Sequence, residues 1–254
     1  MTNVSIPLLS PPHSPIMASF KPLLRPAVRI PQPTQTRPFL SNILSAAAAA
    51  APQTSLQTLR ASRTLPYPSA PIYSIIADVP SYSSFLPYCT QSRITHWSAP
   101  DSATGRRWPS TGVLTSGFGQ FTESFTSRVY CVPGRVVESV GGDTETALPR
   151  ELIKHHLENA DGETISKEGS EGLLTHLKNT WTVEEVKPNV TRIELSLEFR
   201  FANPMYAALS AGVAPKVAEA MVKAFEERVT GLLRDHPEMV GAKLDQLEGS
   251  RLRR

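Results

Sequence analysis

Residues 204–235 read PMYAALSAGVAPKVAEAMVKAFEERVTGLLRD, and no other long segment of the chain repeats its apolar residues at helical spacing. Most of these apolar positions lie three or four residues apart, which places them on one face of a helix. They are Met205, Leu209, Val213, Val217, Ala220, Met221, Ala224, Phe225, Val229, Leu232 and Leu233. The spacing predicts a long amphipathic helix, about 45 Å in length at 1.5 Å per residue. An apolar stripe of that length needs a broad partner.

The ends of this helix are marked by residues with strong positional preferences. Asn203 is a good N-cap before Pro204, and the sequence from Asp235 to Pro237 ends the pattern. Gly212 and Pro215 interrupt the first third, so we expect a kink or a break there. Periodicity alone leaves two interpretations open: a helix packed in a closed core, or a helix that forms the lid of an apolar cavity.

The segment before the helix shows the strictest alternation in the chain, between residues 191 and 202. One face carries Ile193, Leu195, Leu197, Phe199 and Phe201. The intervening residues are charged or polar, which is typical of a strand with one buried face. This strand is therefore the predicted cover for the helix.

Earlier segments complete an antiparallel pattern. Strands are predicted at 55–66 (an edge strand), 90–98, 108–116, 121–132, 136–140 and 176–186, with two short helices at 71–78 and 82–85. The order of strand, two short helices, strands and long helix predicts an α+β fold in which an antiparallel sheet wraps around the helix. Glu123 falls on the apolar face of the strand at 121–132, so it must find a partner or face a cavity that admits water, unless local twist or a bulge turns it outward.

The net positive charge of the chain comes from its N-terminal segment. Residues 1–77 contain no Asp or Glu and six of the 26 Lys and Arg residues, which leaves 20 basic against 23 acidic residues in the remainder. The sequence pI of about 8.9 thus gives no reason to expect a nucleic-acid partner. An acid-free segment rich in Arg, Ser and Ala is typical of an organellar presequence. We assign residues 1–54 to a mitochondrial presequence and disordered leader; many prolines leave a merely disordered basic tail as the alternative.

Two further segments are predicted to lie outside the packed sheet. Residues 141–174 are acidic and rich in Gly and Ser, which favours an exposed inserted loop with a short helix near 150–157. His155 and His156 lie there without a third metal ligand at a fixed spacing, so no zinc site is predicted. The domain is expected to span 55–236, followed by a disordered tail at 237–254. The two cysteines lack metal-type spacing, which suits a reducing compartment.

A spaced set of motifs gives the chain a family resemblance. The set comprises Leu65-Pro66-Tyr67, Tyr73, Ala77-Asp78-Val79, Tyr82, residues 85–89 (FLPYC), Gly117-Phe118, residues 121–127 (FTESFTS), Trp181, Phe199, Pro204-Met205-Tyr206 and residues 221–228 (MVKAFEER). In these positions the chain resembles the mitochondrial coenzyme Q-binding proteins of the START-like (polyketide cyclase/dehydrase, helix-grip) superfamily. The resemblance covers about residues 59–233. The acidic insertion and the small residues at 212–214 depart from the family pattern.

The resemblance implies non-catalytic binding of coenzyme Q (ubiquinone) in an apolar cavity between sheet and helix. It implies no cofactor and no metal, and a lipid carrier that supports respiratory electron transport and coenzyme Q biosynthesis. The implied location is the matrix side of the mitochondrial inner membrane, with peripheral membrane contact, and the implied partners are coenzyme Q biosynthetic proteins or respiratory complexes.

The candidate cavity residues form three groups. The sheet wall is Phe121, Phe125, Trp181, Leu195, Leu197, Phe199 and Phe201; the helix wall is Met205, Leu209, Val213, Val217, Met221 and Phe225; the mouth is Phe85, Leu86, Pro87 and Tyr88 with the helix start near Gly212.

Three other functions fit the same fold. Aromatase/cyclases use the cavity for catalysis, but the sequence shows no Ser/His/Asp set and no paired carboxylates. Glu123, Tyr88 and Arg228 are the plausible acid/base groups, and each also has a structural interpretation. A carrier of another lipid is the second alternative. A ribosome-associated protein is the third, and the mildly acidic domain argues against it.

Overall fold

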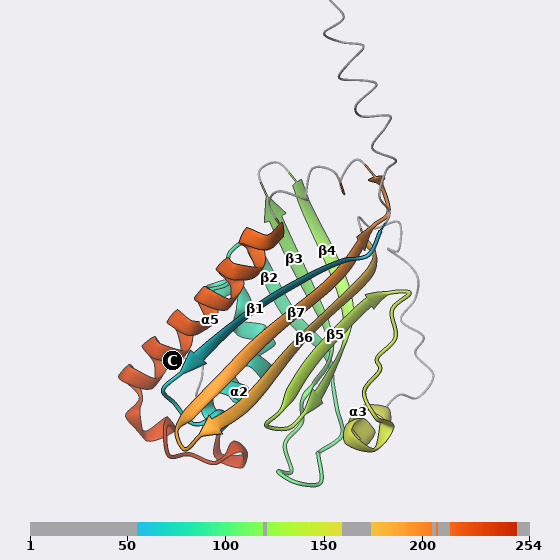
Figure 1. Cartoon of the computed structure of the whole chain (residues 1–254). Helices are drawn as coiled ribbons and strands as arrows, with labels where there is room; N and C mark the ends of the chain where they lie inside the picture. Colours follow the sequence, from blue (N-terminus) through green and yellow to red (C-terminus); the bar gives the residue numbers. More distant parts are fainter. Residues whose placement is uncertain (1–54, 119–120, 159–173, 205–206, 208–213, 248–254) are drawn as a thin grey trace, which may run out of the picture. The chain divides into compact units, whose positions relative to one another are not determined.

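The computed structural model describes residues 55–118, 121–158, 174–204, 207 and 214–247 (Figure 1). Seven antiparallel strands form one sheet in the order β1-β7-β6-β5-β4-β3-β2. They are β1 (Gln57–Leu65), β2 (Cys89–Trp97), β3 (Pro109–Phe118), β4 (Phe121–Val132), β5 (Val136–Gly142), β6 (Leu174–Lys187) and β7 (Val190–Phe201). The sheet curves around the long helix α5 (Ala214–Asp235), which confirms the predicted α+β helix-grip fold.

The alternating patterns and the turn residues account for this sheet. β4 has the predicted bounds, and β1 lies at an edge as expected. Gly134, with φ of +76°, lies in the turn between β4 and β5, and Asn189, with φ of +60°, lies in the turn between β6 and β7. Both positions require the left-handed backbone region that Gly and Asn tolerate. The register therefore follows from the sequence of these tight turns.

Two short helices follow β1 and enter the space inside the curved sheet. α2 (Ser69–Ala77) is buried from Pro71 to Ala77, and the 3-10 helix η1 (Val79–Ser84) continues it. The Tyr73 ring meets Trp108 edge-on at a centroid distance of 5.4 Å. The predicted pair of short helices after the first strand is confirmed, and they occupy one end of the interior.

Helix α5 packs with a face slightly different from the predicted one. Ala218 and Val222 are fully buried, whereas Val217 and Met221 are only half-buried. The described part of α5 begins at Ala214 and includes Pro215 as its second residue. Met205, Leu209, Val213 and the predicted kink at Gly212 lie outside the described residues.

A charged contact fastens α5 to the edge strand. The Arg63 guanidinium of β1 forms ion pairs with Glu219 and Glu226 of α5, the latter at 3.2 Å from Nε. Arg63 lies on the same face of β1 as Leu59 and Ala61, which pack against the core. Leu59 and Ala61 therefore join β1 to the apolar core, and Arg63 joins it to charged residues of the helix.

The chain stays packed beyond the predicted end of the domain. The 3-10 turns η3 (Pro237–Met239) and η4 (Leu244–Gln246) follow α5, and Met239 and Leu247 are buried in the main core. Arg106 Nη1 donates a hydrogen bond to the Leu244 carbonyl at 2.7 Å. The predicted disordered tail from 237 is therefore wrong for residues 237–247, because two isolated apolar residues anchor a segment that lacks periodicity.

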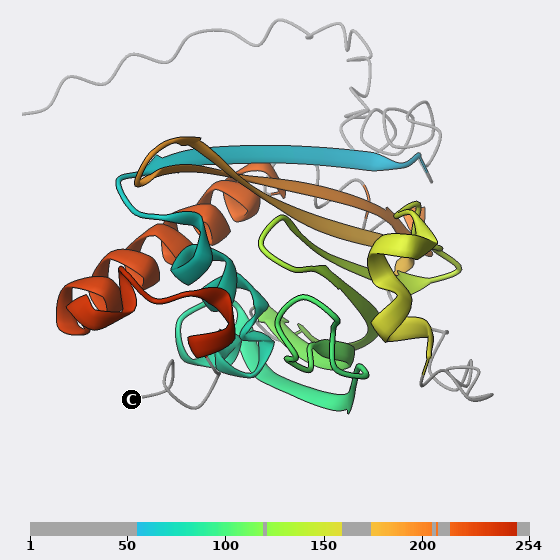
Figure 2. The same cartoon turned by 90° about the horizontal axis from the view of Figure 1, so that it is seen from below.

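The opposite face of the sheet carries a second, smaller cluster. The 3-10 helix η2 (Arg150–Ile153) and helix α3 (Lys154–Leu157) lie across the sheet from α5 (Figure 2), as the short helix predicted at 150–157. Ile153 packs there against Tyr130, Val132 and Val140. The description of residues 141–174 as an exposed insertion is therefore wrong for this part, since Ile153 is fully buried. Residues 159–173 lie outside the described part.

Candidate functional site

Phe225 closes one end of the space between the sheet and α5. Its ring meets Trp181 of β6 at a centroid distance of 4.5 Å, Phe85 at 5.1 Å and Tyr82 at 5.3 Å, all edge-on. Phe225 is fully buried, and so are Leu195 and Trp181 beside it. We call Tyr82, Phe85, Trp181, Leu195 and Phe225 the aromatic floor. Side chains fill the space completely at this level.

Burial decreases along the same faces away from the aromatic floor. Strand register places Asn179 between Ser139 of β5 and Leu197 of β7, one step beyond Trp181. Half-buried residues of this inner surface are Leu59, Leu114, Phe125, Ser139, Leu177, Asn179 and Leu197 on the sheet, with Val217, Met221 and Ala224 on α5. Phe199 is the buried exception, with its ring 5.4 Å from Phe201. The described side chains therefore cover the inner face less completely beyond the aromatic floor than at it.

Polar side chains interrupt this apolar inner surface on its central strands. Ser127 of β4 lies opposite Gly141 of β5. A Cβ added to Gly141 would lie 3.4 Å from the Ser127 hydroxyl. Ser139 and Asn179 face each other across β5 and β6. The Asn179 Oδ1 and Trp181 Nε1 atoms are buried and find no hydrogen-bond partner in the part of the chain that the structure describes. Such orphaned polar atoms are uncommon in native proteins.

Glu123 stays on the inner side of β4. The β3–β4 register runs without a shift from Thr111 paired with Arg128 to Phe118 paired with Phe121, so no bulge turns Glu123 outward. Its side chain is half-buried and pairs in register with exposed Ser116 near the strand end. Of the two predicted alternatives, the inward one therefore holds, at a level that solvent reaches.

The structure brings most predicted cavity residues together and leaves others undescribed. Phe125, Trp181, Leu195, Leu197, Phe199, Phe201, Val217, Met221 and Phe225 all lie on the faces that enclose the interior. Phe121 begins β4, but its side chain is outside the described part, as are Met205, Leu209 and Val213. The sequence-based prediction of the cavity did not include Tyr82, Asn179, Ala218 and Val222, which also lie on the faces that enclose the interior. Asn179 could have been found from its spacing of two from Trp181.

The predicted mouth divides into a buried part and an exposed part. Leu86 is buried in the main core and Phe85 belongs to the aromatic floor. Pro87 is half-buried, and Tyr88 has 45% of its side chain exposed with φ of +65°. The Tyr88 carbonyl accepts a hydrogen bond from the Gly117 N–H at 2.8 Å, which fixes the corner against the end of β3. Only the Pro87–Tyr88 part of the corner thus fits an outward-facing edge.

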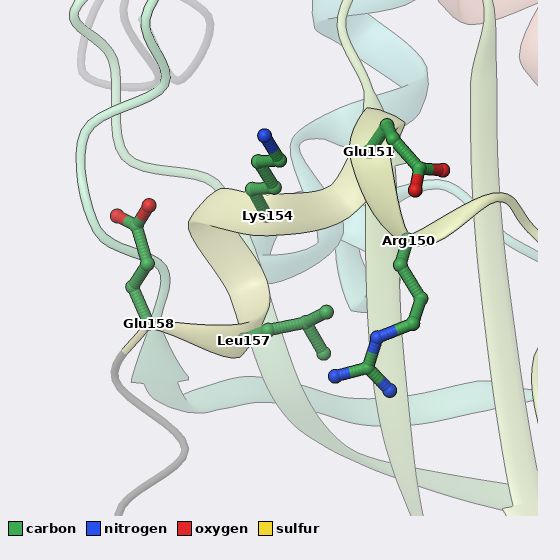
Figure 3. A pocket seen from close by; sticks show the side chains of 5 residues that line it. All are labelled: Arg150, Glu151, Lys154, Leu157 and Glu158. Carbon is green, nitrogen blue, oxygen red and sulfur yellow. The ribbon is translucent and has the colours of Figure 1, made fainter.

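Other features of the described residues have structural roles. Figure 3 shows a surface pocket lined by Arg150, Glu151, Lys154, Leu157 and Glu158 on η2 and α3, away from the sheet–helix space. Nearby, His156 Nε2 accepts the Cys131 N–H at 2.8 Å, where the β3–β4 ladder has ended. The other ring nitrogen, Nδ1, therefore carries the proton and donates to Ser110 Oγ at 2.7 Å. This His does not act as a base toward Ser110, because its proton already points at the hydroxyl.

Buried titratable groups near the interior are held neutral. Burial lowers the pKa of His156 to about 3 and raises the pKa of Cys131 to about 12. Burial also raises the pKa of Tyr73 and of Tyr82 well above the usual value. The two histidine rings of α3 lie 4.3 Å apart. The described residues contain no group of three potential metal ligands. None of the described helices is long and apolar enough to cross a bilayer.

The chain is similar in sequence to a family of known proteins. Residues 65–226 match the family model for polyketide cyclase/dehydrase and lipid transport proteins. The mitochondrial coenzyme Q-binding protein coq10 of Schizosaccharomyces pombe is 30% identical over 173 residues, covering 68% of this chain and 87% of the relative. The ribosome association toxin RatA of Pseudomonas aeruginosa is 26% identical over 174 residues, covering 68% and 96%. A START superfamily protein from Mycobacterium smegmatis aligns with a TM-score of 0.49 and 16% identity, covering 69% of this chain and 98% of that one.

The family assignment rests on the extent of these matches. The family model spans well over half of the chain, from the last residue of β1 into α5. The relatives include coenzyme Q-binding proteins labelled mitochondrial from two yeasts, at 30% and 28% identity. These relatives are binding proteins by name, and the family model also covers cyclases. By sequence, the chain belongs to the polyketide cyclase/dehydrase and lipid transport family.

Proposed function

We propose that the protein binds coenzyme Q (ubiquinone), a quinone with a polyprenyl tail, between the sheet and α5. The observation that carries the proposal is the half-buried apolar inner surface beyond the aromatic floor, in particular Leu197, Val217 and Met221. Lipid pockets are concave and mostly apolar, with a few polar groups that orient the ligand. The Met221 thioether adapts to an irregular chain. The names of the yeast relatives support this ligand class.

The proposed chemistry is transfer between two apolar environments. Each methylene buried from water contributes about 0.8 kcal/mol, so a tail of several isoprene units holds the ligand without polar contacts. Extraction from a bilayer gains little, because the tail leaves one apolar medium for another. The protein therefore docks on the membrane surface and takes up the lipid there, with exposed Tyr88 at the docking edge.

The proposed setting is the mitochondrion. Residues 1–54 are proposed to be the presequence, and residues 55–247 the lipid-binding domain, which contacts the inner membrane peripherally from the matrix side. There it acts as a non-catalytic carrier that supports respiratory electron transport and coenzyme Q biosynthesis, in contact with biosynthetic proteins or respiratory complexes. Support for the compartment comes from the acid-free N-terminus and from the mitochondrial label of the yeast relatives.

The decisive experiment identifies the bound lipid. The full chain is purified from mitochondria, and the lipids extracted from it are analysed by mass spectrometry, with an unrelated matrix protein purified in parallel. We expect ubiquinone to be enriched over the control preparation. Enrichment of a different lipid, or a cyclised aromatic product, would replace the proposal with one of the alternative functions.

A further inference from the structure

Two buried polar atoms at the edge of the aromatic floor find no hydrogen-bond partner among the described residues. Trp181 is 1% exposed, and its Nε1 is one of these atoms. Asn179 Oδ1 is the other. The register of β6 runs unbroken from His176 to Glu185, so residues 179 and 181 point to the same face, about 7 Å apart along the strand. Trp181 contacts Phe225, which identifies that face as the one toward α5.

Trp181 and Asn179 lie where the fully buried core gives way to half-buried residues. Trp181 belongs to the aromatic floor, whereas Asn179 is half-buried although it lies on a central strand. Its cross-strand neighbours are Ser139 on one side and Leu197 on the other, both half-buried. Both polar atoms are buried, so a ligand beyond the floor lies against these two residues at its deep end and reaches their polar atoms when the side chains that cover them shift. Apolar side chains line the rest of its length.

The chemistry of the pair fits a quinone ring. Trp Nε1–H is a donor only, and an Asn amide both donates and accepts. A quinone carries two carbonyl acceptors and a quinol two hydroxyl groups, so the amide can serve both redox forms while the indole donates to an oxygen of either. An isoprenoid tail carries no such group. Leaving buried polar atoms unpaired costs free energy. A quinone carbonyl accepts from the Trp181 indole N–H, and a quinol hydroxyl can also donate to Asn179 Oδ1, whereas the Asn179 amide N–H is the group that donates to a quinone carbonyl.

We propose that Trp181 and Asn179 form the ring subsite of the lipid site, so that the ligand enters ring first and its tail extends over Leu197, Val217 and Met221. This inference rests on the proposed function. Ring-first entry places the polar part of the ligand farthest from the membrane and leaves the tail nearest the bilayer, so that the tail is released first. Ser139 completes the polar surroundings of the ring.

The test compares two probes on the purified full chain and its variants. The probes are a short-tailed ubiquinone and an isoprenoid hydrocarbon of matched tail length, with binding followed by calorimetry and by quenching of tryptophan fluorescence. The variants are Trp181→Phe and Asn179→Leu. The matched controls are Trp97→Phe, at an exposed indole, and Thr182→Val, on the outer face of β6. Each subsite variant is expected to bind ubiquinone about 3- to 10-fold more weakly, as expected for one lost hydrogen bond.

Three results test the ring subsite and the proposed function. The hydrocarbon is expected to bind the subsite variants as well as it binds the wild type, and the two control variants to bind ubiquinone normally. The melting temperature of ligand-free Asn179→Leu is expected to equal or exceed that of the wild type, because an unpaired polar atom is removed. Unchanged ubiquinone affinity in both subsite variants would overturn the ring subsite alone. A wild-type chain that binds no ubiquinone would overturn the proposed function.

Discussion

His156 gives a prediction whose size follows directly from the structure. The folded protein holds this ring neutral, because burial lowers its pKa to about 3 and its Nε2 accepts the Cys131 N–H. In the unfolded chain the pKa is near 6.5. The folded pKa is depressed, so the unfolded state takes up the proton first. The stability contribution of the neutral ring is complete above pH 6.5 and declines as the pH falls toward 3.

The expected loss is about 1.4 kcal/mol in the free energy of unfolding for each pH unit below 6.5, or about 2 kcal/mol at pH 5. The assay is urea unfolding of the wild type and of His156→Gln at pH 7 and pH 5. Gln keeps an acceptor for the Cys131 N–H and a donor for Ser110, but it does not titrate.

Titration of every other group is shared by the two proteins, so the difference in their pH dependence isolates His156. His155, whose pKa burial also lowers, has lost a neighbour in the variant, and His155→Gln serves as the second control. Equal losses of stability in wild type and His156→Gln between pH 7 and pH 5 would refute the argument that α3 is held to β4 by a neutral imidazole.

Further predictions concern the floor, the helix wall and the outer corner. Phe225→Ala should lower the free energy of unfolding by about 3–5 kcal/mol, because a fully buried ring in contact with three others is removed; a loss below about 1 kcal/mol in urea would contradict the filled floor. Val217→Glu should abolish lipid co-purification while Lys223→Glu, which also adds an acid to α5 but at an exposed position, retains it; equal lipid content in both would remove Val217 from the site. Tyr88→Asn should keep the melting temperature, since Asn tolerates φ of +65°, and weaken sedimentation with vesicles; full vesicle binding would show that Tyr88 is not at the docking edge.

The sequence predicted the sheet well because its alternation is strict where it matters. Apolar and polar residues alternate without interruption in β7, and turn residues flank β4. The predicted period and the predicted strand bounds therefore agree with the structure. The buried face of α5 was harder to predict. Residues 220–222 are Ala, Met and Val in succession, which gives two adjacent apolar stripes. Only packing against β1 and β7 selects Val222 over Met221 as the fully buried residue.

Two other differences come from single residues that fold irregular segments. Ile153 fixes η2 to the outer face of β4 and β5 although its surroundings in sequence are acidic. Leu247 fixes the chain after α5 without any periodic pattern. A lone apolar residue carries no periodic signal, so composition favoured exposure in both places. For the same reason Leu86, in a corner predicted as a mouth, is a core residue.

The candidate site follows from a conflict between stability and binding. A closed core would place an apolar residue at 179 and pair or remove the Trp181 indole N–H, because both atoms cost free energy when they are buried alone. The chain instead keeps them at the level where the aromatic floor ends and half-buried apolar residues begin. Filling the space with larger side chains would stabilise the fold and exclude a ligand. Of the two interpretations that helical periodicity left open, the closed core holds for α5 around Phe225. The apolar cavity stays a proposal for the part of α5 from Val217 to Met221, which borders the proposed lipid site.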